Sequence, residues 1–218
     1  MWAGFAFGLL LLTACGSATM PLSGPVVASS ERGSAPRAWD GNALESLRIP
    51  GGDECLGWLA RLGIEHRSLK ATRGVTTPVE VSGPVAEVRY VSAGRSSFVA
   101  DCRLVLALDW IGPHLRQFGV SEVRHSGAYV YRTTRSGRPS RHAKGLAIDV
   151  HGVRVDGKFH TVKRDFEKGL GWGCDTGAPR LNQISCRLRG LRLFRELITP
   201  DHNADHHDHL HLAIADSR

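Results

Sequence analysis

The chain has 218 residues, of which 42% are hydrophobic and 22% charged, and its formal net charge is +7. These values are typical of an ordinary globular domain that is large enough to bury a core. The positive charge would suit nucleic acid, an anionic membrane or an acidic polymer such as a cell wall. However, the basic residues are scattered without a run of five, and no nucleic-acid-binding motif is visible. We therefore expect no nucleic-acid partner.

The chain starts with MWAGFAFGLLLLTAC, an apolar stretch of signal-peptide length that is too short to span a membrane comfortably. It ends in LTAC, and a leucine, two small residues and a cysteine resemble the lipobox of bacterial lipoproteins. The resemblance implies that residues 1–14 form a signal peptide and that a diacylglycerol on Cys15 anchors the protein to a membrane. The alternative is a plain secretory signal that contains a cysteine. No Lys or Arg precedes the apolar stretch, although both kinds of signal usually begin with positive charge.

A lipid anchor would place the protein in the bacterial cell envelope, on the periplasmic face. Gly16 stands where an aspartate would resemble an inner-membrane retention signal, so we expect the outer membrane. Residues 16–42 are rich in Gly, Ser, Ala and Pro and lack apolar periodicity, so they cannot bury enough surface to become ordered. We expect a lipidated, flexible tether over residues 15–42 and a folded domain over residues 43–218.

One helix and two strands are predicted near the start of this domain. In residues 51–69, GGDECLGWLARLGIEHRSL, leucines recur near helical spacing and Gly63 ends the helix. Residues 77–83 and 85–94 have the composition of short strands bounded by Gly and Pro.

Residues 101–119, DCRLVLALDWIGPHLRQFG, predict a second helix with a rich supply of apolar side chains. Asp101 suits its N-cap, and Gly119 ends it. Pro113 lies inside the pattern, so we expect a kink or a break at that position.

The rest of the chain predicts more strands than helices. We expect a strand over residues 122–132, two strands joined by a turn at VDGK over 145–162, an amphipathic helix over 189–198 and a final strand over 208–216. This order of elements indicates an α+β domain, with a mainly antiparallel sheet and helices packed on one side.

Four cysteines remain after Cys15, and an even number in an exported protein suggests two disulfides. Four cysteines allow three pairings. We favour Cys55–Cys102 and Cys174–Cys186, the second because it closes one short loop. A zinc site made of the four thiolates is the alternative, but no C-x2-C pair is present to support it.

Five of the eleven histidines lie between residues 202 and 211. Alternate side chains of an extended strand point the same way, so His209 and His211 face one side while Leu210 and Leu212 face the other. The leucines would bury in the core and hold the backbone rigid. The final strand therefore predicts a preorganised pair of histidines.

A second unusual stretch is SRHAKGLAIDV, residues 140–150. His142 lies seven positions before Asp149, too far for a helical pair, and fits a loop that Gly145 allows to turn tightly. Asp149 then lies on the following strand, where the apolar residues alternate with it. Because a buried carboxylate without a partner is costly, Asp149 should meet a cation, a metal or several hydrogen-bond donors.

Two imidazoles and one carboxylate, with a fourth position open for water, are the ligand set of a catalytic zinc. Such a zinc lowers the pKa of its water from about 16 to about 7 and polarises a carbonyl group. A histidine-rich tail that binds metal adventitiously is the alternative. The joint occurrence of SRHAKGLAID and DHLH favours a built Zn²⁺ site.

These two stretches resemble the S-x-H-x-x-G-x-A-x-D and H-x-H motifs of one zinc peptidase group. The group contains lysostaphin-like endopeptidases, D-alanyl-D-alanine peptidases and the hedgehog signalling domain. More narrowly, the chain is similar to the bacterial extensin-like C-terminal domain family over residues 50–216. Further matching stretches are ECLGWLARLGIEH, DCRLVLALDWI and SGAYVYR. The resemblance implies a fold like that of the hedgehog domain and the D-alanyl-D-alanine peptidases.

The resemblance also implies roles for the residues that match these motifs. His142, Asp149 and His211 match the three zinc ligands. His209 matches the first histidine of the H-x-H motif, which lies beside the metal without binding it. Its implied role is to accept a proton from the zinc-bound water or to stabilise the tetrahedral intermediate.

Three further residues are catalytic candidates by resemblance. Asp208 stands where relatives with an E-x-x-H motif have a glutamate base, but its side chain is shorter and should point away from His211. We therefore rank His209 above it. Arg132 lies upstream of the first ligand, like an arginine that polarises the scissile carbonyl in some relatives; a surface arginine is the alternative. His206 matches an upstream histidine that is a second base in one relative group.

Other polar and aromatic residues are expected to be structural. Ser140 should cap a turn or bond to Asp149, since metal ligands need oriented neighbours. His151 and His160 are interpreted as polar positions on or near strands, and Trp110 and Trp172 as core residues.

Together these features predict a lipoprotein with a zinc-dependent peptidase domain that cuts peptidoglycan stem peptides or crosslinks with metal-activated water. One alternative is a catalytically inactive, zinc-containing lipoprotein that binds the cell wall, because the hedgehog branch keeps the zinc site without acting as a peptidase. Another is a structural lipoprotein whose metal serves only stability. The sequence leaves open which bond is cut, and it does not define the oligomeric state or an activating partner.

Overall fold

The computed structural model describes residues 48–94, 97–171 and 174–216, all within one compact unit of the chain. Outside the described residues lie the predicted signal peptide (1–14), Cys15, the predicted tether (15–42) and Trp172. No helix in the described ranges combines the length and the apolar character needed to cross a membrane.

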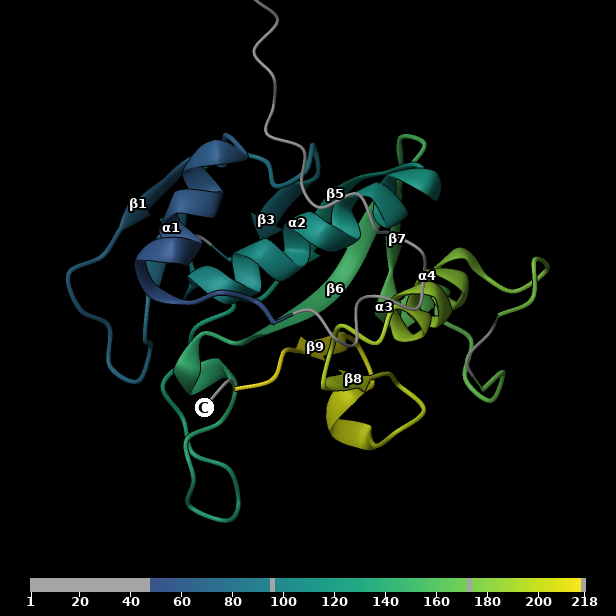
Figure 1. Ribbon diagram of the computed structural model, residues 1–218. Helices are drawn as coiled ribbons and strands as arrows, with labels where there is room; N and C mark the ends of the chain where they lie inside the picture. Colours follow the sequence, from purple (N-terminus) through teal and green to yellow (C-terminus); the bar gives the residue numbers. More distant parts are fainter. Residues whose placement is uncertain (1–47, 95–96, 172–173, 217–218) are drawn as a thin grey trace, which may run out of the picture. The chain divides into compact units, whose positions relative to one another are not determined.

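Two helices near the start of the domain lie where they were predicted. α1 spans Gly52–Arg61, and Gly63 follows it with a φ of 68°. α2 spans Cys102–Gln117 and is capped by Asp101, whose carboxylate accepts a hydrogen bond from the first turn. The two helices pack against each other (Figure 1).

Of the kink or break expected at Pro113, the break does not occur, because α2 continues to Gln117. Pro113 is exposed and lies about one turn before the helix end. The carbonyl oxygen of Asp109 loses its backbone donor there, but on this outer side water can replace it. Burial of the inner face of α2 in the core outweighs the lost hydrogen bond.

All four cysteines of the described domain are in disulfides, and both predicted pairings are confirmed. Cys55–Cys102 is buried and links α1 to α2. Cys174–Cys186 closes a short loop onto a later helix. The alternative of a four-thiolate zinc site is therefore wrong.

Two sheets make up most of the rest of the domain. The smaller sheet is antiparallel, with the order β1 (His66–Ser68), β2 (Pro78–Val81), β4 (Phe98–Asp101). The larger sheet has the order β3 (Arg89–Ser92), β5 (Val120–His125), β6 (Ala147–Val155), β9 (Leu210–Ala213), β8 (Glu196–Ile198), with β7 (Lys158–Thr161) also paired to β6. Among these pairs β3–β5 alone is parallel, which confirms the α+β class with a mainly antiparallel sheet.

Several strand predictions are confirmed, with shifted ends. β6 and β7 form the predicted pair, and the turn between them uses Asp156 and Gly157 at φ of 47° and 83°. The strand predicted over 122–132 is only partly correct: β5 begins at Val120 and ends at His125, and residues 126–132 form a loop. The short strands β1 and β4 carry too little alternation to be predicted.

The helix predicted over residues 189–198 is wrong. α4 (Arg180–Gly190) ends where that helix was expected to begin, Arg192 has a φ of 53°, and β8 follows. Leu191, Phe194, Leu197 and Ile198 do recur at helical spacing, which is why a helix was predicted. The segment nevertheless pairs as a strand from Glu196 onward, and the helix forms in the preceding segment. The short helices α3 (Val162–Asp165), η2 (His142–Lys144) and η3 (Ala204–His206) complete the described fold.

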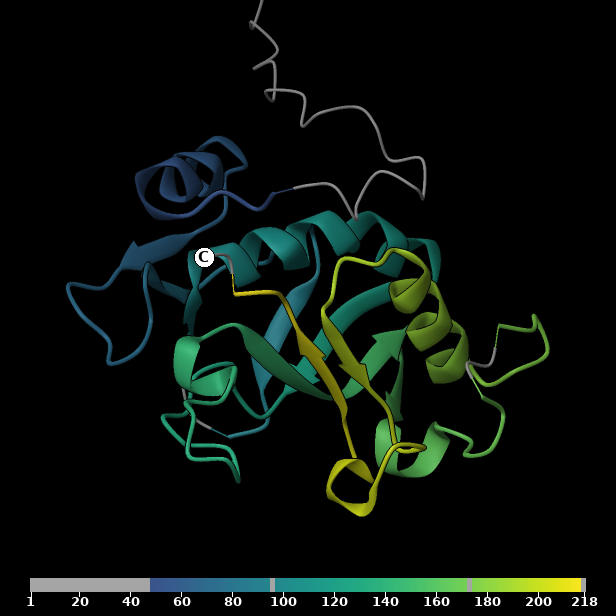
Figure 2. The same cartoon turned by 60° about the horizontal axis from the view of Figure 1, so that its bottom comes forward.

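The larger sheet has one face toward the helices and one face away from them. α2 and α4 contact each other and lie on the same side of this sheet (Figure 2). Val150, Leu210 and Leu212 point to that side and line one apolar space with side chains of both helices. By strand alternation, Asp149 and His211 point to the opposite side. The helices thus hold the sheet rigid while leaving its other face free for polar chemistry.

Candidate metal centre

Asp149 and His211 lie side by side because β6 and β9 pair in one register. The two residues are direct antiparallel partners, so their side chains leave the sheet at the same point. Asp149 Oδ1 lies 2.8 Å from His211 Nδ1. A slip of β9 by one residue would turn His211 into the core and expose Leu210 and Leu212, so the buried leucines of β9 also fix this contact.

His142 reaches the same point from the short helix η2. Ser140 Oγ accepts a hydrogen bond from the backbone N–H of Ala143 at 3.1 Å, which confirms its expected capping role. Gly145 then turns the chain into β6 with a φ of 65°, and a Cβ there would lie 2.6 Å from the backbone nitrogen of Asp101. Only glycine fits this turn, and the turn positions His142 above the sheet.

The three potential ligand atoms form a compact triangle. His142 Nε2 lies 3.2 Å from both Asp149 Oδ1 and His211 Nδ1, and the third side is the 2.8 Å contact within the strand pair. Zinc bonds of about 2.0–2.1 Å in a tetrahedron place neighbouring ligand atoms about 3.3 Å apart. The side chains are 3%, 13% and 9% exposed. The donor set therefore fits a zinc ion.

The hydrogen bonds around these ligands also favour a cation between them. His142 Nδ1 faces the carbonyl oxygen of Ala128 at 3.3 Å, and a carbonyl can only accept, so Nδ1 carries the proton. The Nε2 of a neutral His142 is then an acceptor that faces a carboxylate oxygen and a second imidazole nitrogen. A bound cation satisfies three such acceptors at once.

Burial and the two histidines act on Asp149 in opposite directions. Burial by itself would raise its pKa. When no cation is bound, protonated imidazoles of His142 and His211 donate hydrogen bonds to Asp149 and add positive charge, and both effects hold its pKa well below its usual range. Asp149 is therefore ionised at neutral pH, as a metal ligand must be.

His209 stands beside this triangle without closing it. Its Nε2 lies 3.7 Å from Asp149 Oδ1, while its Nδ1 lies 2.9 Å from Asp208 Oδ1. Asp208 is thus on the far side of His209 from the triangle. A carboxylate that accepts from Nδ1–H leaves Nε2 of His209 as an acceptor.

The two other candidates also lie close by. The guanidinium of Arg132 is 4.0 Å from Asp149 Oδ2, although the side chain is 58% exposed. The ring of His206 lies 5.0 Å from that of His209 and 5.8 Å from that of His211. Burial, and then the charges of the same two histidines, lower the pKa of His206.

Two residues near the site had not been predicted. His151 is two positions after Asp149 and faces the same side, and with Asp208 and His209 it forms a second, more open group of possible metal ligands. His151 is two positions after Asp149 on the same strand, so strand alternation places both side chains on one face. The sequence alone could therefore have predicted that His151 lies near the site. Glu196 Oε2 lies 3.7 Å from His211 Nε2, and no local pattern points to it because it comes from β8.

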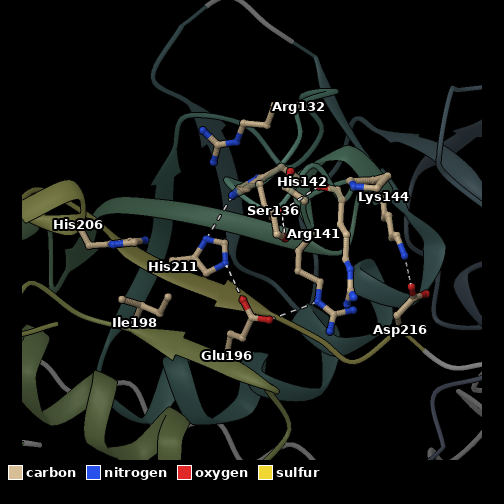
Figure 3. A pocket seen from close by; sticks show the side chains of 14 residues that line it. Arg132, Ser136, Arg141, His142, Lys144, Glu196, Ile198, His206, His211 and Asp216 are labelled. Carbon is tan, nitrogen blue, oxygen red and sulfur yellow. Dashed lines mark hydrogen bonds and ion pairs between the residues drawn. The ribbon is translucent and has the colours of Figure 1, made fainter. Parts of the chain in front are cut away.

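A cavity of about 730 Å³ opens beside His142, His206 and His211. Figure 3 shows these histidines on one side and the ion pair between Lys144 and Asp216 on the other. The remaining lining residues are mostly polar or basic, so the cavity is a polar space next to the triangle.

No curated protein and no solved structure shows significant similarity to the chain. A family match covers residues 54–218, almost the whole described domain, and the family is described as extensin-like protein C-terminus. The chain belongs to the extensin-like protein C-terminus family.

Proposed function

We propose that the chain is a zinc-dependent peptidase that cleaves stem peptides or crosslinks of peptidoglycan at the periplasmic face of the bacterial envelope. A lipid on Cys15 would anchor it, in the outer membrane. The observation that carries the activity is the position of His209, an imidazole beside a complete ligand set with Nε2 only 3.7 Å from Asp149 Oδ1. The resemblance of SRHAKGLAID and DHLH to the lysostaphin, D-alanyl-D-alanine peptidase and hedgehog group supports this reaction class.

Zinc, when held by His142, Asp149 and His211, would polarise a scissile carbonyl and lower the pKa of a bound water. His209 would take the proton of that water at Nε2, because Asp208 holds the proton on Nδ1. Asp208 thus acts as a positioning residue that fixes the tautomer and the ring orientation of His209.

Two further residues would act on the substrate from the open side of the triangle. Arg132 would donate a hydrogen bond to the carbonyl oxygen as negative charge develops on it. His206 Nδ1 lies 2.7 Å from Asn203 Oδ1, which fixes the other nitrogen as an acceptor facing the histidines. His206 would act as a second base, and His209 would pass the proton that it took from water to the leaving amine.

The test is mass spectrometry of purified peptidoglycan after incubation with the zinc-loaded protein. We expect new peptide fragments from the wild type, none from His209→Ala, and none from the wild type after chelation. His207→Ala is the matched control, because His207 lies in the same segment but is exposed and hydrogen-bonds only to the backbone of Ala204 within the described residues.

Two other results of these experiments would contradict the proposal. Tight zinc binding without any new fragment would overturn the peptidase and favour an inactive zinc-containing protein that binds the cell wall. If His209→Ala also lost its zinc, His209 would be a ligand rather than the base.

A further inference from the structure

The loop before the first histidine ligand is folded into a small hairpin. Thr133 and Pro139 form a β-bridge, the backbone N–H of Thr134 donates to the Arg138 carbonyl at 2.7 Å, and that of Ser140 donates to the Arg132 carbonyl at 3.0 Å. Alternate side chains of such a hairpin leave on the same face. The face that lines the cavity carries, in chain order, Arg132, Thr134, Ser136, Arg138 and Ser140.

Among the side chains that line this cavity, cationic groups outnumber carboxylates. The cations are Arg132, Arg138, Arg141 and Lys144, and the carboxylates are Glu196 and Asp216. Each carboxylate is paired, Glu196 with Arg141 at 3.4 Å and Asp216 with Lys144. The guanidinium groups of Arg132 and Arg138, both on the hairpin, are paired with neither of these carboxylates.

The guanidinium of Arg138 has no hydrogen bond or ion pair within the part of the chain that the structure describes, and the closest acidic partner of Arg132 there is Asp149. The backbone bonds make these two arginines diagonal neighbours on one face of the hairpin. Diagonal neighbours lie about 7–8 Å apart, so two long side chains can converge on one anion between them. Guanidinium groups bind carboxylates with paired hydrogen bonds, and the hydroxyl groups of Ser136 and Ser140 supply further donors.

We propose that this hairpin face is a subsite for a free carboxylate of the substrate peptide, close to the bond that is cut. The inference rests on the proposed peptidase function, because it names which part of the substrate the cavity selects. Successive Cα atoms are about 3.8 Å apart, so a carboxylate one or two residues from the scissile carbonyl lies about 4–8 Å from it. The guanidinium of Arg132 lies 4.0 Å from Asp149 Oδ2. The hairpin is therefore close enough to the metal centre to bind a carboxylate at about 4–8 Å from the scissile carbonyl.

The test measures binding instead of turnover, in the zinc-loaded His209→Ala chain so that no peptide is cleaved. Three N-acetylated D-alanyl peptides of equal length serve as probes in calorimetric titrations. One ends in a free carboxylate, one ends in an amide, and one ends in an amide but carries a D-glutamate side chain one residue from the end. Comparing the first and the third peptide separates a terminal carboxylate from a side-chain carboxylate as the ligand, and the second carries neither.

The matched pair of variants is Arg138→Gln and Arg135→Gln, each added to the His209→Ala chain. Both remove one positive charge from the same hairpin, but Arg135 is 97% exposed, leaves on the opposite face and pairs with Asp205 at 3.5 Å. We expect at least one carboxylate peptide to bind about tenfold more tightly than the plain amide. We expect Arg138→Gln to remove this preference and Arg135→Gln to keep it.

Equal binding of all three peptides, or an equal loss in both variants, would overturn the subsite, because only long-range charge would then act. A different result would reject the peptidase proposal while keeping the subsite. A carboxylate preference that depends on Arg138, together with intact peptidoglycan in the digestion experiment, would keep the subsite and reject cleavage.

Discussion

Asp208 Oδ1 lies 2.9 Å from His209 Nδ1, on the opposite side of the imidazole from Asp149. The arrangement gives Asp208 a role that its place in the sequence does not suggest. It cannot reach the metal triangle itself, but it determines which nitrogen of His209 faces that triangle.

We expect Asp208→Asn to lower peptidoglycan cleavage about 10- to 100-fold while zinc content stays at the wild-type value. An asparagine amide can present its N–H₂ group to Nδ1, which would place the imidazole proton on Nε2. Asp205→Asn is the control, since Asp205 lies in the same segment but pairs with the exposed Arg135. Unchanged turnover in Asp208→Asn, or loss of zinc from it, would contradict this role.

Zinc should stabilise the folded chain. Zinc at about 100 times its dissociation constant adds about 2.7 kcal/mol to the free energy of unfolding, provided that the unfolded chain binds none. For a domain of this size the midpoint of thermal unfolding should rise by about 5–10 °C over that of the chelated protein. The increase should vanish in His142→Ala and persist in His207→Ala. A zinc response that survives in His142→Ala would place the ion elsewhere, for example at His151, Asp208 and His209.

Stability should depend on the neutral state of His125. This residue is fully buried, its ring nitrogens have no hydrogen-bond partner among the described residues, and it packs on Phe98. Burial, and then the charge of His151, lower the pKa of His125 to about 4. Because the folded pKa is below the unfolded value of about 6.5, His125 costs stability as the pH falls from about 6.5 to about 4.

The measurement compares the free energy of unfolding of the wild type and His125→Phe in denaturant at pH 7 and pH 4.5. The wild type should lose about 2.5 kcal/mol more than the variant. The difference between the proteins matters because burial raises the pKa of Asp109 to about 6, which penalises folding as the pH rises and so opposes His125. Asp109 is present in both proteins, so its effect cancels. Parallel pH profiles would show that His125 can be charged in the fold.

The two disulfides should contribute unequally to stability. Cys55–Cys102 closes 47 residues and Cys174–Cys186 closes 12. In the chain-entropy estimate these loops correspond to about 4 and about 3 kcal/mol. Replacing the buried first pair by alanines also removes packing between α1 and α2, which enlarges the gap. Denaturant unfolding of the two double variants tests the order, and a larger loss from the second pair would contradict it.

Local patterns in the sequence determine much of this protein. Strand alternation alone puts Asp149 opposite the apolar residues of its strand and His211 opposite the leucines of β9, and the structure has both arrangements. The caps and stops of α1 and α2 are equally local. These features depend on neighbours within a few positions, so their physical causes can be seen in the sequence.

The tertiary structure decides what comes from far apart in the chain. The register of β6 and β9 brings Asp149 and His211 together, and neither strand carries information about that register by itself. Glu196 reaches His211 only because residues 196–198 pair with β9 instead of continuing α4. Pairing with a neighbouring strand satisfies the backbone groups of this segment and overrides its helical propensity, which is why the local pattern predicted it wrongly.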